Sequence, residues 1–350
     1  MELPSPEKIE QFKKTITALK QDVAILAGIA DPDSLANAQL MSKVLIHFDK
    51  TPHIFFLNDK DDPNIAIWIN SFELTVEPST MSVFLEDPKK YSVILLDLND
   101  ARILGLEPEQ IVINIVIDHH EKVIDEKKVS WSWIDKSGAS TSMTMYLFEQ
   151  LQIADISNDE NLATQCAVAI IVDLGGNVLS SECTLLDLQM LTKTKPSVNT
   201  EKAGQLAYIY YNKKLFHLMG EAWKNHSEKG QVVVTHLDLG SIKENEHVYL
   251  AVIADLLYKF TCFDIVIVWA KTNDTKRILY KARSGKKEMS LDHVIKNEFG
   301  ESGGARAGKG AGFLPALPKV FNPLDQDAEY AFIQFMQLQM FAIASQYASE

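Results

Sequence analysis

Apolar runs of strand length alternate with amphipathic helical segments along the first half of the chain. A helix is expected to begin near Ser5 and Pro6. The pattern then predicts strands at 23–29, 53–57, 92–98 and 111–117, and helices at 34–47, 140–151, 161–173 and 181–191. Such alternation is typical of a mostly parallel sheet covered by helices. We therefore expect an α/β fold.

The pattern breaks at residues 192–200, which are rich in Lys, Thr, Ser, Asn and Pro and poor in apolar residues. Such a segment indicates a linker or a surface loop beside a domain boundary. The length of 350 residues is also typical of two domains. We expect a first domain at 1–192, a linker at 193–206 and a smaller α/β domain at 207–350.

The second domain has its own alternating pattern. It predicts strands at 231–236, 263–270 and 277–283, and helices at 245–260 and 290–299. A glycine-rich segment at 300–312 is predicted as a loop, and residues 325–348 have the spacing of a C-terminal helix.

Composition limits the classes of function. The net charge of −13 disfavours binding to duplex DNA, which depends on many Lys and Arg contacts to phosphate. The apolar runs are shorter than the roughly 20 residues of a membrane span, and residues 1–20 lack the apolar region of a secretory signal. Three cysteines without CxxC spacing argue against a disulfide framework. We expect a cytoplasmic protein.

Four short motifs with carboxylate or imidazole side chains follow one another in the first domain. They are Asp31-Pro32-Asp33, Asp97-Leu98-Asn99-Asp100, Asp118-His119-His120 and Asp173-Leu174-Gly175. The middle two follow predicted strands directly, at the sheet edge where ligands bind in open α/β folds. Carboxylates with imidazoles suit Mn²⁺ or Mg²⁺. Such cations assist phosphoester hydrolysis by neutralising the attacking and leaving oxygens.

The order of these motifs resembles the DHH family of phosphoesterases, and the segment 139–142 also looks like that family. The resemblance implies that Asp97 bridges two metal ions, Mn²⁺ being our first choice. It implies that Asp33, His119 and Asp173 complete one metal site and that Asp31 belongs to the other. Three residues are expected to be catalytic, namely Asp97, His119 and His120. Arg102 and His120 are expected to contact substrate, with Asp118 orienting the ligands.

One position departs from the family. The family has a histidine four residues before the first aspartate, and this chain has Ala27 there. An alanine offers no lone pair, so we expect one well-formed metal site and a weakened second one. His53 and the cluster at 59–62 are conceivable replacement ligands, although a solvated loop is the favoured interpretation of both.

The second domain resembles the DHHA1 domain through Arg283-Ser284, Asp292 and Phe299-Gly300 before the glycine-rich segment. The resemblance implies an active site in the cleft between the two domains. It implies that substrate is bound by Arg283, Ser284, Gly303, Gly304 and Arg306. The family's Gly-Gly-His run is changed here, because Ala305 occupies the expected histidine position. Arg306 and Lys309 are candidates to bind phosphate instead.

These features predict a metal-dependent phosphoesterase. The expected substrate is a small phosphorylated nucleotide or a short oligonucleotide, such as a dinucleotide, a cyclic dinucleotide or a 3′,5′-bisphosphonucleotide. The missing histidines leave open a nucleotide-binding or regulatory protein of the same fold that has lost catalysis. A less favoured alternative is an inorganic pyrophosphatase. The apolar C-terminal segment and the resemblance together suggest a homodimer.

Overall fold

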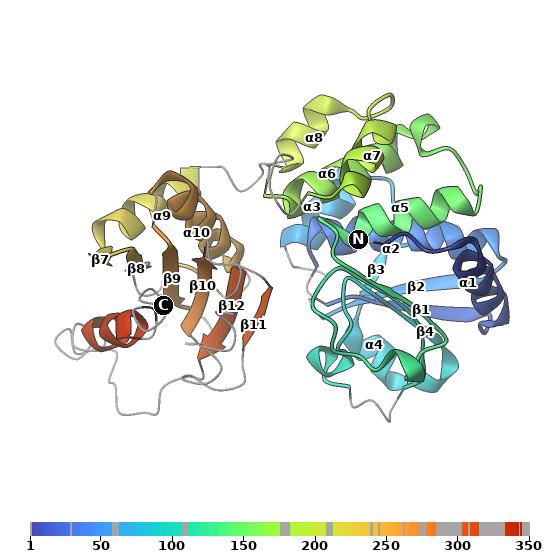
Figure 1. Ribbon diagram of the computed structural model, residues 1–350, viewed down its shortest axis with the longest axis horizontal. Coiled ribbons are helices and arrows are strands. Elements are labelled where there is room, and N and C mark those ends of the chain that lie inside the picture. Colours follow the sequence, from blue (N-terminus) through green and yellow to red (C-terminus); the bar gives the residue numbers. More distant parts are fainter. Residues whose placement is uncertain are drawn as a thin grey trace. The chain divides into compact units, whose positions relative to one another are not determined.

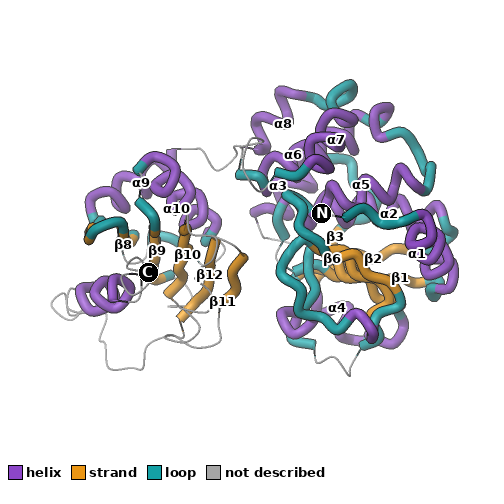
Figure 2. The backbone as a smooth tube through the Cα atoms, in the orientation of Figure 1, coloured by secondary structure: helices purple, strands orange, loops and turns teal. Residues whose placement is uncertain are grey.

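The computed structural model describes residues 2–28, 30–57, 63–106, 111–175, 183–207, 213–238, 241–243, 246–261, 263–272, 278–284, 303–306, 309–314, 333–342 and 344. The chain forms two compact units, Met1–Tyr208 and Ile209–Glu350. The strands of each unit form one sheet (Figure 2).

The first unit contains a parallel sheet with the strand order β3-β2-β1-β4-β5-β6. Its strands are β1 (Asp22–Leu26), β2 (Thr51–Phe56), β3 (Pro78–Thr80), β4 (Ser92–Leu96), β5 (Ile113–Asp118) and β6 (Trp131–Ile134). The chain proceeds outward from β1 in one direction and from β4 in the other, so the order reverses between these two strands. A crevice at the carboxyl ends is expected at such a reversal.

Helices cover both faces of this sheet (Figure 1). They are α1 (Pro6–Ala18), α2 (Pro32–His47), α3 (Pro63–Ser71), α4 (Met81–Glu86), α5 (Ser140–Gln150), α6 (Glu160–Asp173), α7 (Leu185–Thr194) and α8 (Thr200–Ala207). Short 3-10 turns occur at Pro88–Lys90, Ala101–Leu104, Glu126–Lys128 and Ile156–Asn158. Helices α2 and α5 lie on one face and α4 on the other (Figure 1).

The sequence explains these elements. β1 and β4 are almost wholly apolar and buried on both faces, as parallel strands between helices must be. Helix α1 begins at Pro6 because Ser5 accepts a hydrogen bond from the amide of Lys8. Its buried side chains include Phe12, whose ring lies 4.5 Å from that of Trp131 in β6. Burial of each large apolar side chain contributes about 1.5–3 kcal/mol.

The second unit contains a mixed sheet with the order β11-β12-β10-β9-β8-β7. Its strands are β7 (Ser227–Lys229), β8 (Val232–His236), β9 (Ile265–Lys271), β10 (Ile278–Ser284), β11 (Gly303–Arg306) and β12 (Lys309–Leu314). Only the β8–β9 pair is parallel among these described strands. Helices α9 (Lys213–Lys224) and α10 (Val248–Phe260) pack against Val266 and Val268 of β9. Helical residues 333–342 pack against the opposite face.

The α/β fold predicted from the sequence is confirmed. The predicted loop at 300–312 is wrong in its described part, since β11 and β12 form an antiparallel pair there. Glycine has a low strand propensity, and pairing with β10 overrides it.

Residues 193–206, predicted as a linker, include most of α8, which packs on α6. The predicted helix at 290–299 lies outside the described residues, as do Asp292, Phe299 and Gly300. Within the described chain, no helix has the length and apolarity of a membrane span.

Candidate metal centre

The carboxyl ends of β1, β4 and β5 meet at one edge of the first sheet, beside the reversal of strand order. Asp31 caps α2 in the connection after β1, Asp97 follows β4, and His119 follows β5. Asp173 is the last residue of α6, which ends where Gly175 adopts a left-handed conformation with φ of 61°. The motifs therefore come together at the edge where an open α/β sheet binds ligands.

Four of the predicted ligands converge at this edge. Donor atoms of Asp33, His119 and Asp173 all lie within 4.8 Å of one another. Nε2 of His119 lies 3.3 Å from Oδ1 of Asp97 and 3.5 Å from Oδ2 of Asp173. The imidazole is thus surrounded by carboxylate oxygens, as in a metal site built from nitrogen and oxygen donors.

The hydrogen bonding of His119 fits it to bind a metal. Its Nδ1 lies 3.1 Å from the carbonyl oxygen of Ser137, which can only accept a hydrogen bond. Nδ1 therefore carries the proton of the neutral ring, and Nε2 keeps its lone pair on the side of the carboxylates. The side chain is 2% exposed, so this orientation is fixed by packing as well.

Asp97 provides a second test of whether these residues suit a metal ion. Its backbone has φ of 54°, and its amide donates to the carbonyl of Ile117 at 3.0 Å. Oδ1 is buried and accepts no hydrogen bond from any residue in the described part of the chain. A buried carboxylate oxygen in this state is costly unless a cation neutralises it. The residues present therefore fit a divalent cation.

Asp33 is held rigidly beside these groups. Its carboxylate accepts hydrogen bonds from the amide of Ser140 at 2.7 Å, the hydroxyl of Ser140 at 2.9 Å and the amide of Thr141 at 2.9 Å. Burial, together with repulsion from Asp97 and Asp173, nevertheless raises the pKa of Asp33 to about 8. Metal binding at this point requires loss of that proton.

Asp31 is also repelled by the charges of Asp97 and Asp173, and it caps a helix as well. Its carboxylate caps α2 by accepting from the amide of Ser34 at 2.9 Å. Burial, and then repulsion from Asp97 and Asp173, raises the pKa of Asp31 to about 7. Asp31 can thus contribute to a cation site only when the group has lost its proton.

No imidazole stands at the position of Ala27 in the described structure. Ala27 is fully buried just beyond β1, and its amide donates to the carbonyl of Phe55 at 3.2 Å. His53 cannot replace the missing ligand, because its Nε2 lies 2.8 Å from Oδ1 of Asp22, at the amino end of β1. The other suggested replacement, the cluster at 59–62, lies outside the described residues.

Asp118 orients its neighbours. It is fully buried, and its Oδ1 accepts hydrogen bonds from the amide of His119 at 2.8 Å and from Nδ1 of His120 at 2.7 Å. Its Oδ2 accepts one from the Asn99 side chain. Burial alone would raise the pKa of Asp118, but the bond from His120 and its charge lower it overall. Burial lowers the pKa of His120, and the bond to Asp118 and the charge of Asp97 outweigh this and raise it.

Arg102 is tied to its own motif. Its guanidinium donates to the two carboxylate oxygens of Asp100 at 2.9 and 2.8 Å, and its side chain is 60% exposed. The pair stabilises the turn that follows Asp97. Contact between Arg102 and substrate remains a prediction.

The predicted substrate residues of the second unit lie on β10 and β11, two strands of one sheet that are separated by β12. Arg283 is buried in β10, where it donates to both oxygens of Asp255 in α10, at 2.6 and 3.0 Å, and to two backbone carbonyls. These contacts use four of its five N–H donors. Ser284 ends β10, while Gly303, Gly304 and Arg306 belong to β11. The structure thus gives Arg283 a structural partner that the sequence did not reveal.

Two residues near the centre were missed from the sequence, Ser137 and Asp187. For Asp187 the sequence does contain a local pattern, because Thr184 and Asp187 have the spacing of a helix capping box. That motif marks helix starts in general and says nothing about a site.

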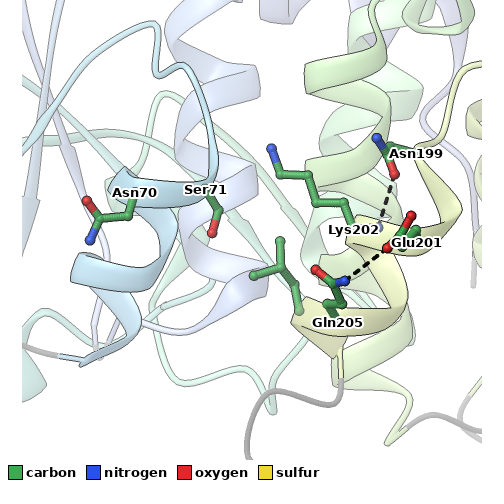
Figure 3. A pocket seen from close by; sticks show the side chains of 7 residues that line it. Asn70, Ser71, Asn199, Glu201, Lys202 and Gln205 are labelled. Atoms are coloured by element: carbon green, nitrogen blue, oxygen red, sulfur yellow. Dashed lines mark hydrogen bonds between the residues drawn. The ribbon is translucent and has the colours of Figure 1, made fainter.

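A pocket elsewhere in the first unit is not part of this centre (Figure 3). It lies between α3 and α8 and is lined by Asn70, Ser71, Asn199, Glu201, Lys202, Gln205 and Leu206. Its polar groups partly pair with one another, since Gln205 donates to Glu201 at 3.3 Å and Asn199 accepts from the amide of Lys202 at 3.0 Å.

No protein family and no curated protein matches the chain by sequence. Solved structures do match. An exopolyphosphatase-related protein from Bacteroides fragilis has a TM-score of 0.67 at 14% identity, over 97% of this chain and 98% of that one. A putative family II inorganic pyrophosphatase from Methanococcus jannaschii has a TM-score of 0.42 at 14% identity, over 89% and 99%. The pGpG-specific phosphodiesterase PggH from Vibrio cholerae has a TM-score of 0.37 at 13% identity, over 89% and 98%.

The match to the Bacteroides protein extends over nearly all of both chains and identifies the fold. This chain therefore shares its fold with the Bacteroides protein, and the resemblance of its motifs to those of the DHH/DHHA1 phosphoesterases stays a prediction.

Proposed function

We propose that the protein is a divalent-metal-dependent phosphohydrolase that acts on a small nucleotide phosphodiester or phosphomonoester. The observation that carries the proposal is the convergence of Asp33, Asp97, His119 and Asp173, with Nε2 of His119 facing carboxylate oxygens of Asp97 and Asp173. The fold shared with an exopolyphosphatase-related protein supports hydrolysis of phosphate compounds in general. The nucleotide part of the substrate rests on the motif resemblance.

Asp33, Asp97, His119 and Asp173 would hold the principal cation, and Asp31 would assist a weaker second one. Mn²⁺ is the first choice and Mg²⁺ the second, because the donors are oxygen and nitrogen. A cation here would supply neutralisation of phosphate charge and a lowered pKa for bound water.

His120 would act on the substrate itself. It is 41% exposed, unlike the buried His119, and its ring lies 4.5 Å from that of His119. Its bond to Asp118 and the charge of Asp97 outweigh burial and raise the pKa of His120, which increases the share of the protonated form at a given pH. A protonated imidazole at the rim can donate a hydrogen bond to a phosphate oxygen or a proton to the leaving oxygen.

Binding of the rest of the substrate is assigned to the second unit. Ser284, Gly303, Gly304 and Arg306 would contact it, since a glycine-rich backbone exposes N–H groups and a guanidinium binds phosphate in a bidentate manner. Arg283 would act chiefly by holding the end of β10 through Asp255.

The direct test measures Mn²⁺-dependent release of mononucleotide from a short dinucleotide, beside a 3′,5′-bisphosphonucleotide and pyrophosphate. Asp97→Asn is the informative variant, because asparagine tolerates the left-handed backbone at this position and removes the charge with little change in side-chain volume. Asp100→Asn is the matched control, as Asp100 pairs with Arg102. We expect Asp97→Asn to lose turnover and Asp100→Asn to keep it. Absence of turnover on every substrate would contradict the proposal, and faster turnover of pyrophosphate would identify a pyrophosphatase.

A second candidate function is nucleotide binding without catalysis, and Ala27 is the observation that favours it. With no imidazole there, the described residues complete only one cation site clearly. Micromolar nucleotide binding without turnover, with one Mn²⁺ per chain by elemental analysis, would establish this alternative. Turnover abolished by Asp97→Asn would exclude it.

A further inference from the structure

Asp187, in the first turn of α7, is a fully buried carboxylate outside the group of predicted ligands. Its Oδ1 accepts a hydrogen bond from the hydroxyl of Ser137 at 3.1 Å, and its Oδ2 accepts one from the amide of Gly138 at 2.9 Å. Oδ2 also accepts from the amide and the hydroxyl of Thr184, at 2.7 and 2.6 Å. Asp187 therefore joins the start of α7 to the loop that follows β6.

The segment 135–141, which comprises that loop and the start of α5, contacts the metal centre at several points. The carbonyl of Ser137 accepts from Nδ1 of His119 at 3.1 Å. The amides of Ser140 and Thr141 hold the carboxylate of Asp33. One short segment thus fixes two predicted ligands that come from different parts of the chain.

Gly138 shows how tightly this loop is packed. A Cβ atom at this position would lie 2.5 Å from Cδ2 of Leu174 and 2.7 Å from Oδ2 of Asp187. Leu174 follows Asp173 directly, so the loop is confined between Asp187 and the segment that carries a third predicted ligand. Only glycine permits this approach.

We propose that Asp187 is a positioning residue of the metal centre. Its carboxylate holds Ser137 and Gly138 so that the Ser137 carbonyl keeps the proton of His119 on Nδ1 and directs Nε2 toward the cation. Groups that orient a metal-binding imidazole in this way affect metal affinity strongly although they do not touch the ion. This inference rests on the metal site of the proposed function.

The competing explanation is that Asp187 only caps α7. Thr184→Val removes the Thr184 hydroxyl, which accepts from the Asp187 amide at 3.4 Å and donates to Oδ2 of Asp187 at 2.6 Å. It separates the two roles because the carboxylate keeps its bonds from the Thr184 amide and from Ser137 and Gly138. Asp187→Asn removes the negative charge and leaves one oxygen as acceptor for the bonds from Ser137, Gly138 and Thr184, so it weakens the hold on the loop.

The experiment has two readouts on the full-length chain. The first is the tautomer of His119 in metal-free, ¹⁵N-histidine-labelled protein by NMR, with the signal assigned through His119→Gln. The second is Mn²⁺ affinity by titration calorimetry. Wild-type protein is expected to show Nδ1–H alone. Asp187→Asn is expected to give mixed tautomers and Mn²⁺ binding about 10–100-fold weaker, and Thr184→Val is expected to change neither.

Unchanged tautomer and affinity in Asp187→Asn would overturn the inference, as would equal changes in Thr184→Val. If Asp187→Asn does not fold, Ser137→Ala takes its place, with an affinity about tenfold weaker expected and unchanged values overturning the inference. Absence of Mn²⁺ binding in wild-type protein would remove the proposed function, whereas the tautomer readout would still test the position of His119.

Discussion

Nε2 of His119 lies 3.3 Å from Oδ1 of Asp97, an oxygen that accepts no hydrogen bond among the described residues. Both atoms are acceptors when the imidazole is neutral and protonated on Nδ1. Two acceptors do not attract one another, so the pair is held close by the fold, and a shared cation would satisfy both atoms.

Mn²⁺ is therefore expected to stabilise the protein. At 100 times the dissociation constant, one bound ion adds about 2.7 kcal/mol to the free energy of unfolding. For a unit of about 200 residues this corresponds to a rise in Tm of about 5–10 °C. Scanning calorimetry with and without Mn²⁺ measures it. Asp97→Asn should abolish the rise, and Asp100→Asn should keep it; an equal rise in both variants would place the ion elsewhere.

The metal-free protein is expected to lose stability as pH rises toward about 8. Burial first, and then repulsion between carboxylates, raises the folded-state pKa of Asp33 to about 8 and that of Asp31 to about 7, from 3.8. Between the unfolded-state pKa of 3.8 and these raised values, the folded state holds more protons than the unfolded state. Stability that is fully present below the unfolded-state pKa is therefore lost as the pH rises through the raised values. Urea unfolding from pH 5.5 to 8.5 measures the slope, which Asp33→Asn should reduce. A slope unchanged by that variant would refute the assignment.

Mn²⁺ affinity is expected to change with pH in the opposite sense. Because the same carboxylates must lose protons to bind the ion, affinity should rise between about pH 6 and pH 8.5. Titration calorimetry in buffers of different ionisation enthalpy measures the protons released. Affinity independent of pH over this range would show that Asp33 does not bind the ion.

Acid should destabilise the second unit through His236. Burial lowers the pKa of His236, whose ring stacks on Trp269 with centroids 5.1 Å apart. The unfolded state then binds the proton more readily, so stability present above about pH 6.5 is lost as the pH falls below that value. Hydrogen exchange in β8 at pH 5 and pH 7 measures this loss. His236→Phe should remove the difference, and His217→Gln, at a side chain 76% exposed, should not.

Gly138→Ala should destabilise the first unit by about 1–3 kcal/mol, as overpacking does in a closed interior. The added methyl would meet Leu174 and Asp187 at 2.5 and 2.7 Å. Gly204→Ala in α8 is the control, since a Cβ there meets nothing within 4 Å and alanine favours the helix. Denaturant midpoints of the two variants measure the contrast, and equal midpoints would contradict the packing described around Gly138.

The sequence predicted the convergence of Asp33, Asp97 and His119 because their motifs are tied to strand ends, which parallel pairing brings to one edge. It did not predict the pairing of Arg283 with Asp255, because contacts between a strand and a helix across a core leave no local pattern. The role of Asp187 was missed for the same reason. Its neighbours Ser137 and Gly138 are far away in the chain, and only the capping box with Thr184 is local.

The pairing of β1 with β4 has a consequence for how the protein is made. The two strands are separated in the chain by the whole segment that contains β2 and β3, and Asp173 comes later still, at the end of α6. A ribosome must therefore release most of the first unit before the cation has a complete set of ligands. A divalent cation bound there would stabilise the finished unit but could not guide its early folding, so starvation for the metal should lower the lifetime of the protein and leave its rate of folding unchanged.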